Sequence, residues 1–325
     1  MKTISARPRT VKPERLCFGD TIGIVAPASP PPDPASVDHS IEALEKFGFK
    51  PKLAKNARAR HGYLAGTDRQ RAADLMAMFA APKVKAIICL RGGYGSARLV
   101  EILDYDLIRR HPKIFAGYSD ITSLHGILGR QTGLITFHAP MLNGALSKAD
   151  LPEFTRASFF RTLMEAKPPG NIANGYAEKT VTILRRGVAE GRLVGGNLSV
   201  LCAAIGTPYA PVFKDKVLFI EDVGEKPYRL DRMLTHLWNA GILQQVAGVA
   251  IGVNSDCEDP NAAKATEYRQ TSADVIKERL SLLKVPVVTG LPFGHVDLNA
   301  TLPVGAKARL DANRGELVIT EAAVS

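Results

Sequence analysis

The sequence predicts an α/β protein in two parts, with a parallel sheet in the first part and a mixed sheet in the second. Strand, turn and helix patterns alternate over about the first 140 residues, which is typical of a doubly wound parallel sheet. Strand patterns become denser after that point, with two helical stretches among them. A composition of 46% hydrophobic and 23% charged residues is ordinary for a packed globular protein.

A short strand and two amphipathic helices come first. Residues 21–26 form an apolar strand pattern that ends at the Pro-rich stretch 27–34. The following helix ends before Gly48, which suits the left-handed position after a helix. Its apolar face comprises Val37, Ile41, Leu44 and Phe47. We expect Asp68 to cap the next helix, whose buried face comprises Ala72, Leu75, Met76 and Phe79.

Two further strands of the first part run directly into polar turns. The buried strand 84–90 leads into Arg91-Gly-Gly-Tyr-Gly95, and a helix with Leu99, Ile102 and Leu103 is expected next. The strand 113–117 leads into Tyr118-Ser-Asp120. A helix then carries Ile121, Leu124, Ile127 and Leu128 on one face. A side chain that follows such a strand lies at the carboxyl edge of the sheet, where open α/β sheets bind ligands.

A connector rich in Pro and Gly, with one short helix, occupies residues 149–180. The pattern therefore divides the chain into an N-terminal domain at 1–148 and a C-terminal domain at 181–325. Helical stretches near 230–238 and 275–283 lie among the strands of the second domain. Its strands are expected at 181–184, 217–220, 247–253, 285–289, 306–310 and 317–320.

The net charge of +10 is the unusual bulk property of the chain. No block of Lys and Arg is interleaved with aromatic residues, so we expect no nucleic-acid partner. A positive surface suits small anionic substrates, because it concentrates carboxylates and phosphates near a cleft. Neither an apolar signal region nor an apolar stretch of about 20 residues occurs, so we expect a cytoplasmic protein that does not engage a membrane.

Metal and cofactor motifs are missing from the sequence. The four cysteines (Cys17, Cys89, Cys202 and Cys257) lie far apart and form no C-x-x-C pair. No H-E-x-x-H motif or other close cluster of His and acidic residues occurs. We therefore expect neither a metal nor another cofactor.

Ser119 is a candidate nucleophile, because it stands between a buried strand and a helix. The positive N-terminal end of that helix would stabilise an oxyanion formed beside the hydroxyl. Ser119 or Asp120 could equally be a plain helix cap. The segment Gly117-Tyr-Ser-Asp-Ile121 lacks the second glycine of the G-x-S-x-G elbow, which argues against an ordinary α/β-hydrolase.

Two glycine-rich segments are candidate ligand-binding turns. Arg91-Gly-Gly-Tyr-Gly95 follows a strand, where glycines let the backbone approach a ligand closely. Gly195-Gly-Asn197 is a weaker example of the same pattern. Neither segment matches the nucleotide motifs G-x-G-x-x-G or G-x-x-x-x-G-K-[ST], and a tight turn without a ligand is the alternative interpretation.

Among the seven histidines, His295 has the setting best suited to a general base. It lies in Pro292-Phe-Gly-His-Val-Asp297, a loop after a strand, which favours an accessible imidazole. His138 is the runner-up. Glu221 comes directly after the strand 217–220 and could orient an imidazole, although it could also cap a helix or pair with Arg229.

As an ordered set, the motifs of this chain resemble those of the LD-carboxypeptidase family, over nearly the whole chain. In the first half they are Gly19-Asp-Thr-Ile-Gly-Ile-Val-Ala-Pro-Ala-Ser29, Gly66-Thr-Asp68, Arg91-Gly-Gly-Tyr-Gly-Ser96, and Gly117-Tyr-Ser-Asp-Ile-Thr122 with His125. In the second half they are Gly195-Gly-Asn-Leu198, Glu221-Asp-Val-Gly-Glu225, Tyr228-Arg-Leu-Asp231, and Gly294-His295 with Pro303.

The resemblance implies that Ser119 is the nucleophile of a Ser-His-Glu triad completed by His295 and Glu221. It also implies a flavodoxin-like N-terminal domain, a smaller swivel-like C-terminal domain and a homodimer. The activity it implies is removal of the terminal D-Ala from a murein tetrapeptide during peptidoglycan recycling. A relative of the same fold, like the microcin C immunity peptidases, could cleave another amide with the same triad.

Further site residues are expected around this triad. We expect the backbone N–H groups of Gly93 and Asp120 to form an oxyanion hole. Arg91 is the candidate anchor for a substrate carboxylate, through its bidentate guanidinium. Gly92, Tyr94 and Asn197 are the remaining candidate substrate contacts. In a different class, a protein that binds a nucleotide or phosphate without catalysis could use the same two glycine-rich segments.

Overall fold

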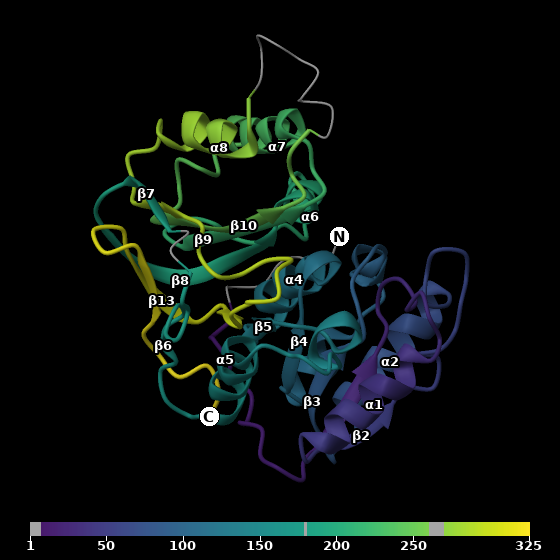
Figure 1. The fold of residues 1–325 in the computed structure, drawn as a ribbon. Coiled ribbons are helices and arrows are strands. Elements are labelled where there is room, and N and C mark those ends of the chain that lie inside the picture. Colours follow the sequence, from purple (N-terminus) through teal and green to yellow (C-terminus); the bar gives the residue numbers. More distant parts are fainter. Residues whose placement is uncertain (1–7, 179–180, 260–269) are drawn as a thin grey trace.

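The computed structural model describes residues 8–178, 181–259 and 270–325. Two sheets lie side by side, one from each half of the chain, and helices pack against both of them (Figure 1). This arrangement confirms the predicted two-part α/β architecture, with a mostly parallel first sheet and a mixed second sheet. Residues 1–7, 179–180 and 260–269 lie outside the described residues.

The first sheet has the strand order β12-β5-β4-β3-β1-β2. Its parallel strands are β1 (Thr21–Val25), β2 (Lys50–Leu53), β3 (Val84–Cys89), β4 (Ile114–Gly117) and β5 (Thr136–His138). The sixth strand, β12 (Leu302–Val304), comes from the far end of the chain and pairs antiparallel with β5. The order 2-1-3-4-5 of the parallel strands is that of doubly wound sheets, whose carboxyl edge binds ligands.

The helices of the first half are α1 (Ser36–Lys46), α2 (Asp68–Ala80), α3 (Tyr105–Arg110) and α4 (Thr122–Thr132). The prediction that Asp68 caps α2 is wrong. Thr67 is the cap and forms a reciprocal capping box with Gln70, whereas the Asp68 carboxylate pairs with Arg71 and Arg98. Met76 is only partly buried, and Met78 takes its place on the buried face of α2.

The predicted helix through Leu99, Ile102 and Leu103 is also wrong. The chain forms a short 3₁₀ turn at Ser96–Leu99 and then a further turn at residues 100–102, and the true helix begins only at Tyr105. Ile102 is 47% exposed, so its place in an apolar pattern did not reflect burial. Asp104 caps α3 by accepting a hydrogen bond from the Leu107 N–H, which explains where the helix starts.

The second sheet has the order β6-β14-β13-β8-β9-β10-β11-β7. Its strands are β6 (Gly170–Asn171), β7 (Thr182–Arg185), β8 (Val188–Asn197), β9 (Val217–Val223), β10 (Gly248–Ser255), β11 (Val287–Thr289), β13 (Lys307–Asp311) and β14 (Glu316–Ile319). The four central strands β8 to β11 are parallel, and the outer ones pair antiparallel. Glu221 therefore lies within β9 rather than in a loop after it.

Three helices cover one face of this sheet: α6 (Leu198–Ala204), α7 (Pro227–Asn239) and α8 (Ser272–Leu280) (Figure 1). The other face joins the core of the first half, because Phe219 and Phe293 belong to the same apolar cluster as the first sheet. The site described below lies where the two sheets meet.

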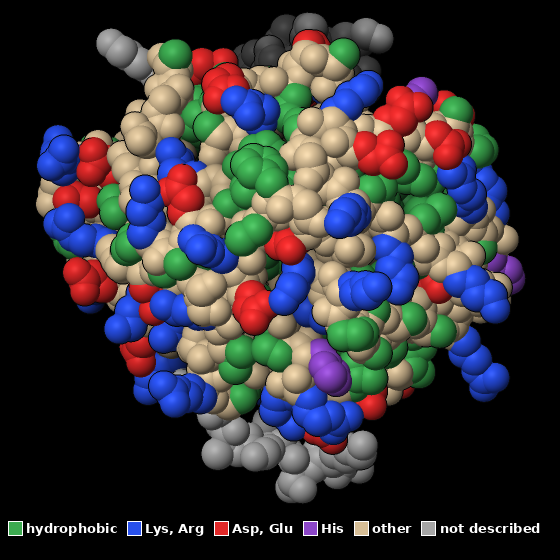
Figure 2. All heavy atoms as spheres, turned by 90° about the horizontal axis from the view of Figure 1, so that it is seen from below, with side chains coloured by type: hydrophobic (Ala, Val, Ile, Leu, Met, Phe, Trp, Pro, Cys, Tyr) green, Lys and Arg blue, Asp and Glu red, His purple; other side chains and the backbone are tan. Residues whose placement is uncertain are grey.

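Both sheets also include a short strand from another part of the chain: β12, from the predicted C-terminal domain, joins the first sheet, and β6, from the predicted connector, joins the second. The domain limits at 148 and 181 stay a prediction from sequence pattern. The connector contains the helix α5 (Glu153–Met164), which packs beside the first sheet. Of the helices in the described ranges, none is long and apolar enough to cross a membrane. Figure 2 shows basic side chains spread over one face, with acidic ones between them.

Candidate active site

Ser119 occupies a strained turn at the carboxyl edge of the first sheet. The strand β4 ends at Gly117, and Ser119 opens a 3₁₀ turn (Ser119–Ile121) that leads into α4. Its φ of 63° places it in the left-handed region. This region costs a residue with a side chain about 1–2 kcal/mol, and such strain concentrates at functional sites. The side chain is partly exposed.

Gly92 packs directly against this serine. A Cβ atom at position 92 would lie 3.0 Å from Ser119 Cβ and 3.1 Å from Ser119 Oγ. Only a glycine fits this approach without displacing the hydroxyl. The turns after β3 and β4 are therefore in contact, as expected from their common sheet edge.

The two amides predicted for the oxyanion hole lie on these same turns. Neither the Gly93 nor the Asp120 N–H has a hydrogen-bond acceptor in the part of the chain that the structure describes. The Asp120 carboxylate instead accepts the Ser96 N–H at 2.8 Å, and burial raises the pKa of this carboxyl group. That bond ties the turn after β3 to the turn after β4.

Glu221 of β9 and His295 of the loop that follows β11 form a hydrogen-bonded pair. His295 Nδ1 lies 2.7 Å from Oε2 of Glu221, whose side chain is fully buried. A carboxylate accepts from the protonated ring nitrogen, so the pair favours the tautomer with Nδ1–H and a free acceptor at Nε2. The Ser255 hydroxyl donates to the His295 carbonyl at 2.9 Å, which fixes the backbone of the loop.

Helix α5 holds the same loop from the other side. The hydroxyl of Thr155 donates to the Asp297 carbonyl and accepts the Asn299 N–H at 2.9 Å. The Asn299 side chain in turn accepts the Gly294 N–H at 3.2 Å. Sequence analysis missed these residues, because nothing in the predicted connector indicated that its helix would contact a loop about 140 positions later in the chain.

Tyr118 brings the two halves of the site together. Its ring lies 4.7 Å from the His295 ring, centroid to centroid, and Ser119 is the next residue. Burial, with the nearby Glu221 and Asp297 carboxylates, raises the pKa of Tyr118 to about 12. Both partners are described, and no hydrogen bond joins Ser119 Oγ to the imidazole in this structure. In unliganded hydrolases such bonds often tighten only when substrate binds.

The remaining predicted contacts have other partners. Arg91 donates to the Pro30 carbonyl at 3.3 Å, and the Tyr94 N–H donates to Ser29 Oγ at 3.1 Å. Asn197 is 3% exposed, caps α6 and donates to the Asp222 carboxylate at 2.8 Å. Its side chain thus has a structural role, and its contact with a substrate stays a prediction, as do those of Arg91, Gly92 and Tyr94.

His138, the runner-up base, is fully buried, and neither ring nitrogen has a partner among the described residues. Burial lowers its pKa well below the usual range. His125 is equally enclosed and bonds the Gly117 carbonyl at 2.8 Å and the Thr136 hydroxyl at 2.9 Å. It therefore supports the end of β4, two residues before Ser119.

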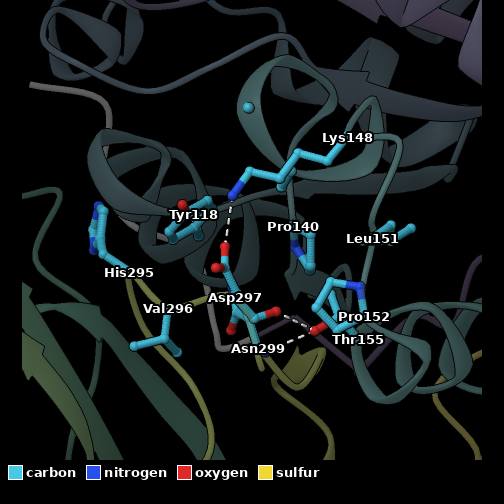
Figure 3. Close-up of a pocket in the computed structure, with 12 residues that line it drawn as sticks. Tyr118, Pro140, Lys148, Leu151, Pro152, Thr155, His295, Val296, Asp297 and Asn299 are labelled. Atoms are coloured by element: carbon cyan, nitrogen blue, oxygen red, sulfur yellow. Dashed lines mark hydrogen bonds and ion pairs between the residues drawn. The ribbon is translucent and has the colours of Figure 1, made fainter.

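A pocket of about 370 Å³ opens beside His295 (Figure 3). Tyr118 and the loop after His295 form one side, and the segment that leads into α5 forms the other. Lys148 and Asp297 face each other in it at 2.6 Å. No group of three or more His, Cys, Asp or Glu that could hold a metal occurs within residues 8–178, 181–259 and 270–325.

The site thus contains a serine on a strained turn, a tyrosine next to it that contacts an imidazole, and a buried carboxylate paired with that imidazole. A serine, an imidazole and a carboxylate are the three groups of a serine-hydrolase triad. Comparison with known proteins defines the family. The LD-carboxypeptidase N-terminal domain matches residues 22–139, and the LD-carboxypeptidase C-terminal domain matches residues 190–310. The chain belongs to the LD-carboxypeptidase family of serine hydrolases, as the sequence motifs indicated.

Its similarity to individual relatives extends over almost the full length. A probable murein peptide carboxypeptidase of Bacillus subtilis is 41% identical over 97% of this chain and 95% of that protein. The crystal structure of muramoyltetrapeptide carboxypeptidase from Oxalobacter formigenes has a TM-score of 0.79 at 31% identity, covering 93% of this chain and 99% of that one. The microcin C7 self-immunity protein MccF, solved with aspartyl sulfamoyl adenosine, has a TM-score of 0.86 at 27% identity and covers 97% and 100%.

Proposed function

We propose that this protein is a serine LD-carboxypeptidase that releases the terminal D-Ala from a murein tetrapeptide. The names of two relatives support the substrate class. The observation that carries the assignment of residues is the hydrogen bond between His295 and the buried Glu221, together with the ring contact of His295 with Tyr118, which precedes Ser119. In this proposal Ser119 is the nucleophile, His295 the base and acid, and Glu221 the residue that orients the imidazole.

Each step follows from these positions. His295 Nε2 takes the Ser119 proton while Oγ bonds to the carbonyl carbon of the scissile amide. The C–N bond then breaks as Nε2 returns the proton to the departing amine, which leaves an acyl-serine. Water repeats the sequence, releases the acid and restores the hydroxyl. Glu221 stabilises the imidazolium at each transfer through the Nδ1 hydrogen bond.

The tetrahedral oxygen would be held by the turns around Ser119. The N–H groups of Gly93 and Asp120 are the donors we assign to it, since both lack internal acceptors among the described residues. Loss of one such donor typically costs about 3 kcal/mol of transition-state stabilisation. The strained turn and the close approach of Gly92 keep these groups in place before substrate arrives.

The setting of the reaction follows from the same proposal. Murein peptides carry carboxylates, and the net charge of +10 would attract them. We place the reaction in the cytoplasm, as part of peptidoglycan recycling, and infer a homodimer from the resemblance to the family.

The proposal is tested by mass spectrometry of murein tripeptide, tetrapeptide and pentapeptide incubated with purified protein. We expect the tetrapeptide to lose one D-Ala and the tripeptide to stay intact. Ser119→Ala should lower kcat by about 10⁴-fold or more, because the proposed acyl intermediate forms on the hydroxyl that this variant lacks. Its circular dichroism spectrum should match that of the wild type. Hydrolysis at the wild-type rate by Ser119→Ala would end the assignment.

A second candidate activity is supported by the similarity to MccF. The same three residues could cleave the amide of an aminoacyl sulfamoyl adenosine, which differs from a murein peptide in its leaving group. Parallel kinetics on that compound and on the tetrapeptide would decide between them. We expect the larger kcat/KM for the tetrapeptide. A protein that only binds a nucleotide or phosphate would hydrolyse neither compound, and Ser119→Ala would leave its ligand binding unchanged.

A further inference from the structure

The chemistry of the proposed reaction locates the leaving amino acid. His295 must protonate the departing amine, so that amine lies against the imidazole. In a single C-terminal residue the carboxylate is attached to the same carbon as the amine, so its oxygens lie within about 3–4 Å of the nitrogen. A carboxypeptidase of this kind therefore needs its carboxylate anchor in the space next to the histidine.

The pocket of Figure 3 is such a space. It is lined by His295 and Tyr118, and Lys148 is its only lysine or arginine among the described residues. Its volume of about 370 Å³ accommodates one amino acid with room for water. Arg91, which the sequence suggested as the anchor, instead donates to Pro30 in the turn after β1.

Lys148 is held in a fixed relation to the imidazole. Its ammonium lies 2.6 Å from the Asp297 carboxylate, two residues beyond His295, and Thr155 of α5 fixes the Asp297 backbone. An ammonium has three donors, so the two that do not bond Asp297 remain available. The Lys148 side chain is 40% exposed, and an incoming anion can reach it.

A further donor lies in the same pocket. The hydroxyl of Tyr118 carries its proton at neutral pH, as any phenol does, and burial with the neighbouring carboxylates raises the pKa of Tyr118 further, to about 12. A carboxylate between the ammonium and this hydroxyl would accept a hydrogen bond from each. The Asp297 carboxylate also offsets the charge of Lys148 when the pocket is empty.

We propose that Lys148 anchors the terminal carboxylate of the leaving amino acid and so makes the enzyme selective for a free C-terminus. This assignment rests on the proposed function and names the recognition element of that same site. Without the carboxylate, a substrate would lose a charge-assisted contact at the leaving group.

The test compares two substrates, the murein tetrapeptide and the same peptide with its C-terminal carboxylate converted to a primary amide. For the wild type we expect kcat/KM for the acid to exceed that for the amide by about 10- to 100-fold. Lys148→Met should lower kcat/KM for the acid by about the same factor and leave that for the amide unchanged. Lys167→Met removes a lysine that is paired with Glu165 on the surface, and both substrates should be cleaved as before.

The alternative is that the Lys148–Asp297 pair only fastens the loop of His295. Lys148→Met would then slow both substrates equally, and Asp297→Asn would do the same. If Lys148 is the anchor, Asp297→Asn retains the preference for the acid. If Lys148→Met still cleaves the acid in preference to the amide, the inference about Lys148 is wrong, but the proposed peptidase function is unaffected. A wild-type protein that releases no D-Ala from the acid overturns the proposed function, and the anchor with it.

Discussion

The backbone of Ser119 shows how a single residue can be held in an unfavourable conformation for the sake of its side chain. Its φ of 63° places Ser119 in the left-handed region, in the turn between β4 and α4. The Cβ atom conflicts with the backbone in this region, and a glycine would not. The chain retains a serine there, so the position of the hydroxyl takes precedence over local stability.

Replacement of Ser119 by glycine and by alanine separates strain from chemistry. Both variants lack the hydroxyl and should be inactive, but only glycine relieves the left-handed conformation. We expect the unfolding free energy of Ser119→Gly to exceed that of Ser119→Ala by about 1 kcal/mol. Urea titration of the two variants measures the difference. Equal stabilities would mean that the turn is not strained.

Gly92→Ala tests the contact between the two turns. The added methyl group would lie about 3 Å from both Cβ and Oγ of Ser119 and push the hydroxyl from its place. Because small displacements of a reacting group are costly, we expect kcat to fall by about 10- to 100-fold while the fold persists. Gly129→Ala is the matched control, since a Cβ at position 129 meets nothing within 4 Å. Its kcat should equal that of the wild type.

At the scale of elements, the sequence predicted those helices and strands whose apolar pattern is continuous along the chain. The unit from β4 to α4 was predicted because a buried strand, a polar turn and a periodic helix follow one another. The ten-residue strand β8 was missed, because Glu190, Gly191 and Arg192 interrupt its apolar pattern. The glycines at its end suggested a loop, but they let the strand approach α4, since a Cβ at Gly196 would lie 2.4 Å from Thr122 Oγ1.

Helix α5 contributes to the site through its contacts with the loop of His295. Thr155→Val tests this contribution. Valine keeps the shape but removes the hydroxyl that bonds Asp297 and Asn299 on the loop of His295. We expect a stability loss of about 2 kcal/mol from the unsatisfied Asn299 N–H, together with a fall in kcat of about 10-fold or more.

Thr132→Val provides the control for this variant. Thr132 is also buried in a helix, donates to the Leu128 carbonyl and accepts the Leu134 N–H, but it lies away from the site. Its loss should destabilise the protein to a similar extent and leave kcat unchanged. An equal fall of kcat in both variants would show that α5 has no special role in placing His295.

At the scale of the whole molecule, the site exists only where the two halves meet. Tyr118 and Ser119 lie in the turn after β4 of the first sheet, whereas Glu221 lies in β9 of the second sheet and His295 in the loop after β11. The motifs predicted the identity of these residues, but they could not predict the ring contact of Tyr118 or the pocket around Lys148. Those features depend on the packing of distant segments, which leaves no periodic pattern in the sequence.

The buried histidines at this junction make the stability of the whole fold depend on pH. Burial lowers the pKa of His125 to about 4, below the value of about 6.5 for an unfolded chain. The unfolded state therefore binds more protons between these values, and His125 makes the fold less stable as the pH falls through this range. The full loss is about 3 kcal/mol for this one group.

Asp222 acts in the opposite direction. Burial raises its pKa to about 6, whereas its usual value is 3.8. The folded state then binds more protons between these values, so the burial of Asp222 reduces stability as the pH rises from about 4 to 6. Because the two groups offset one another, the wild type alone cannot reveal either contribution.

His125→Gln isolates the histidine, since an amide can bond the Gly117 carbonyl and the Thr136 hydroxyl but does not titrate in this range. We expect this variant to be less stable than the wild type at pH 7 and to lose less stability on acidification. Between pH 7 and 4.5 the difference between the two unfolding free energies should shrink by about 2 kcal/mol. Urea titrations at both values measure it, and Thr132→Val, which removes no titrating group, should keep a constant difference from the wild type. A constant difference for His125→Gln as well would mean that the histidine titrates alike in the folded and unfolded chains, in conflict with its burial between α4 and the strands β4 and β5.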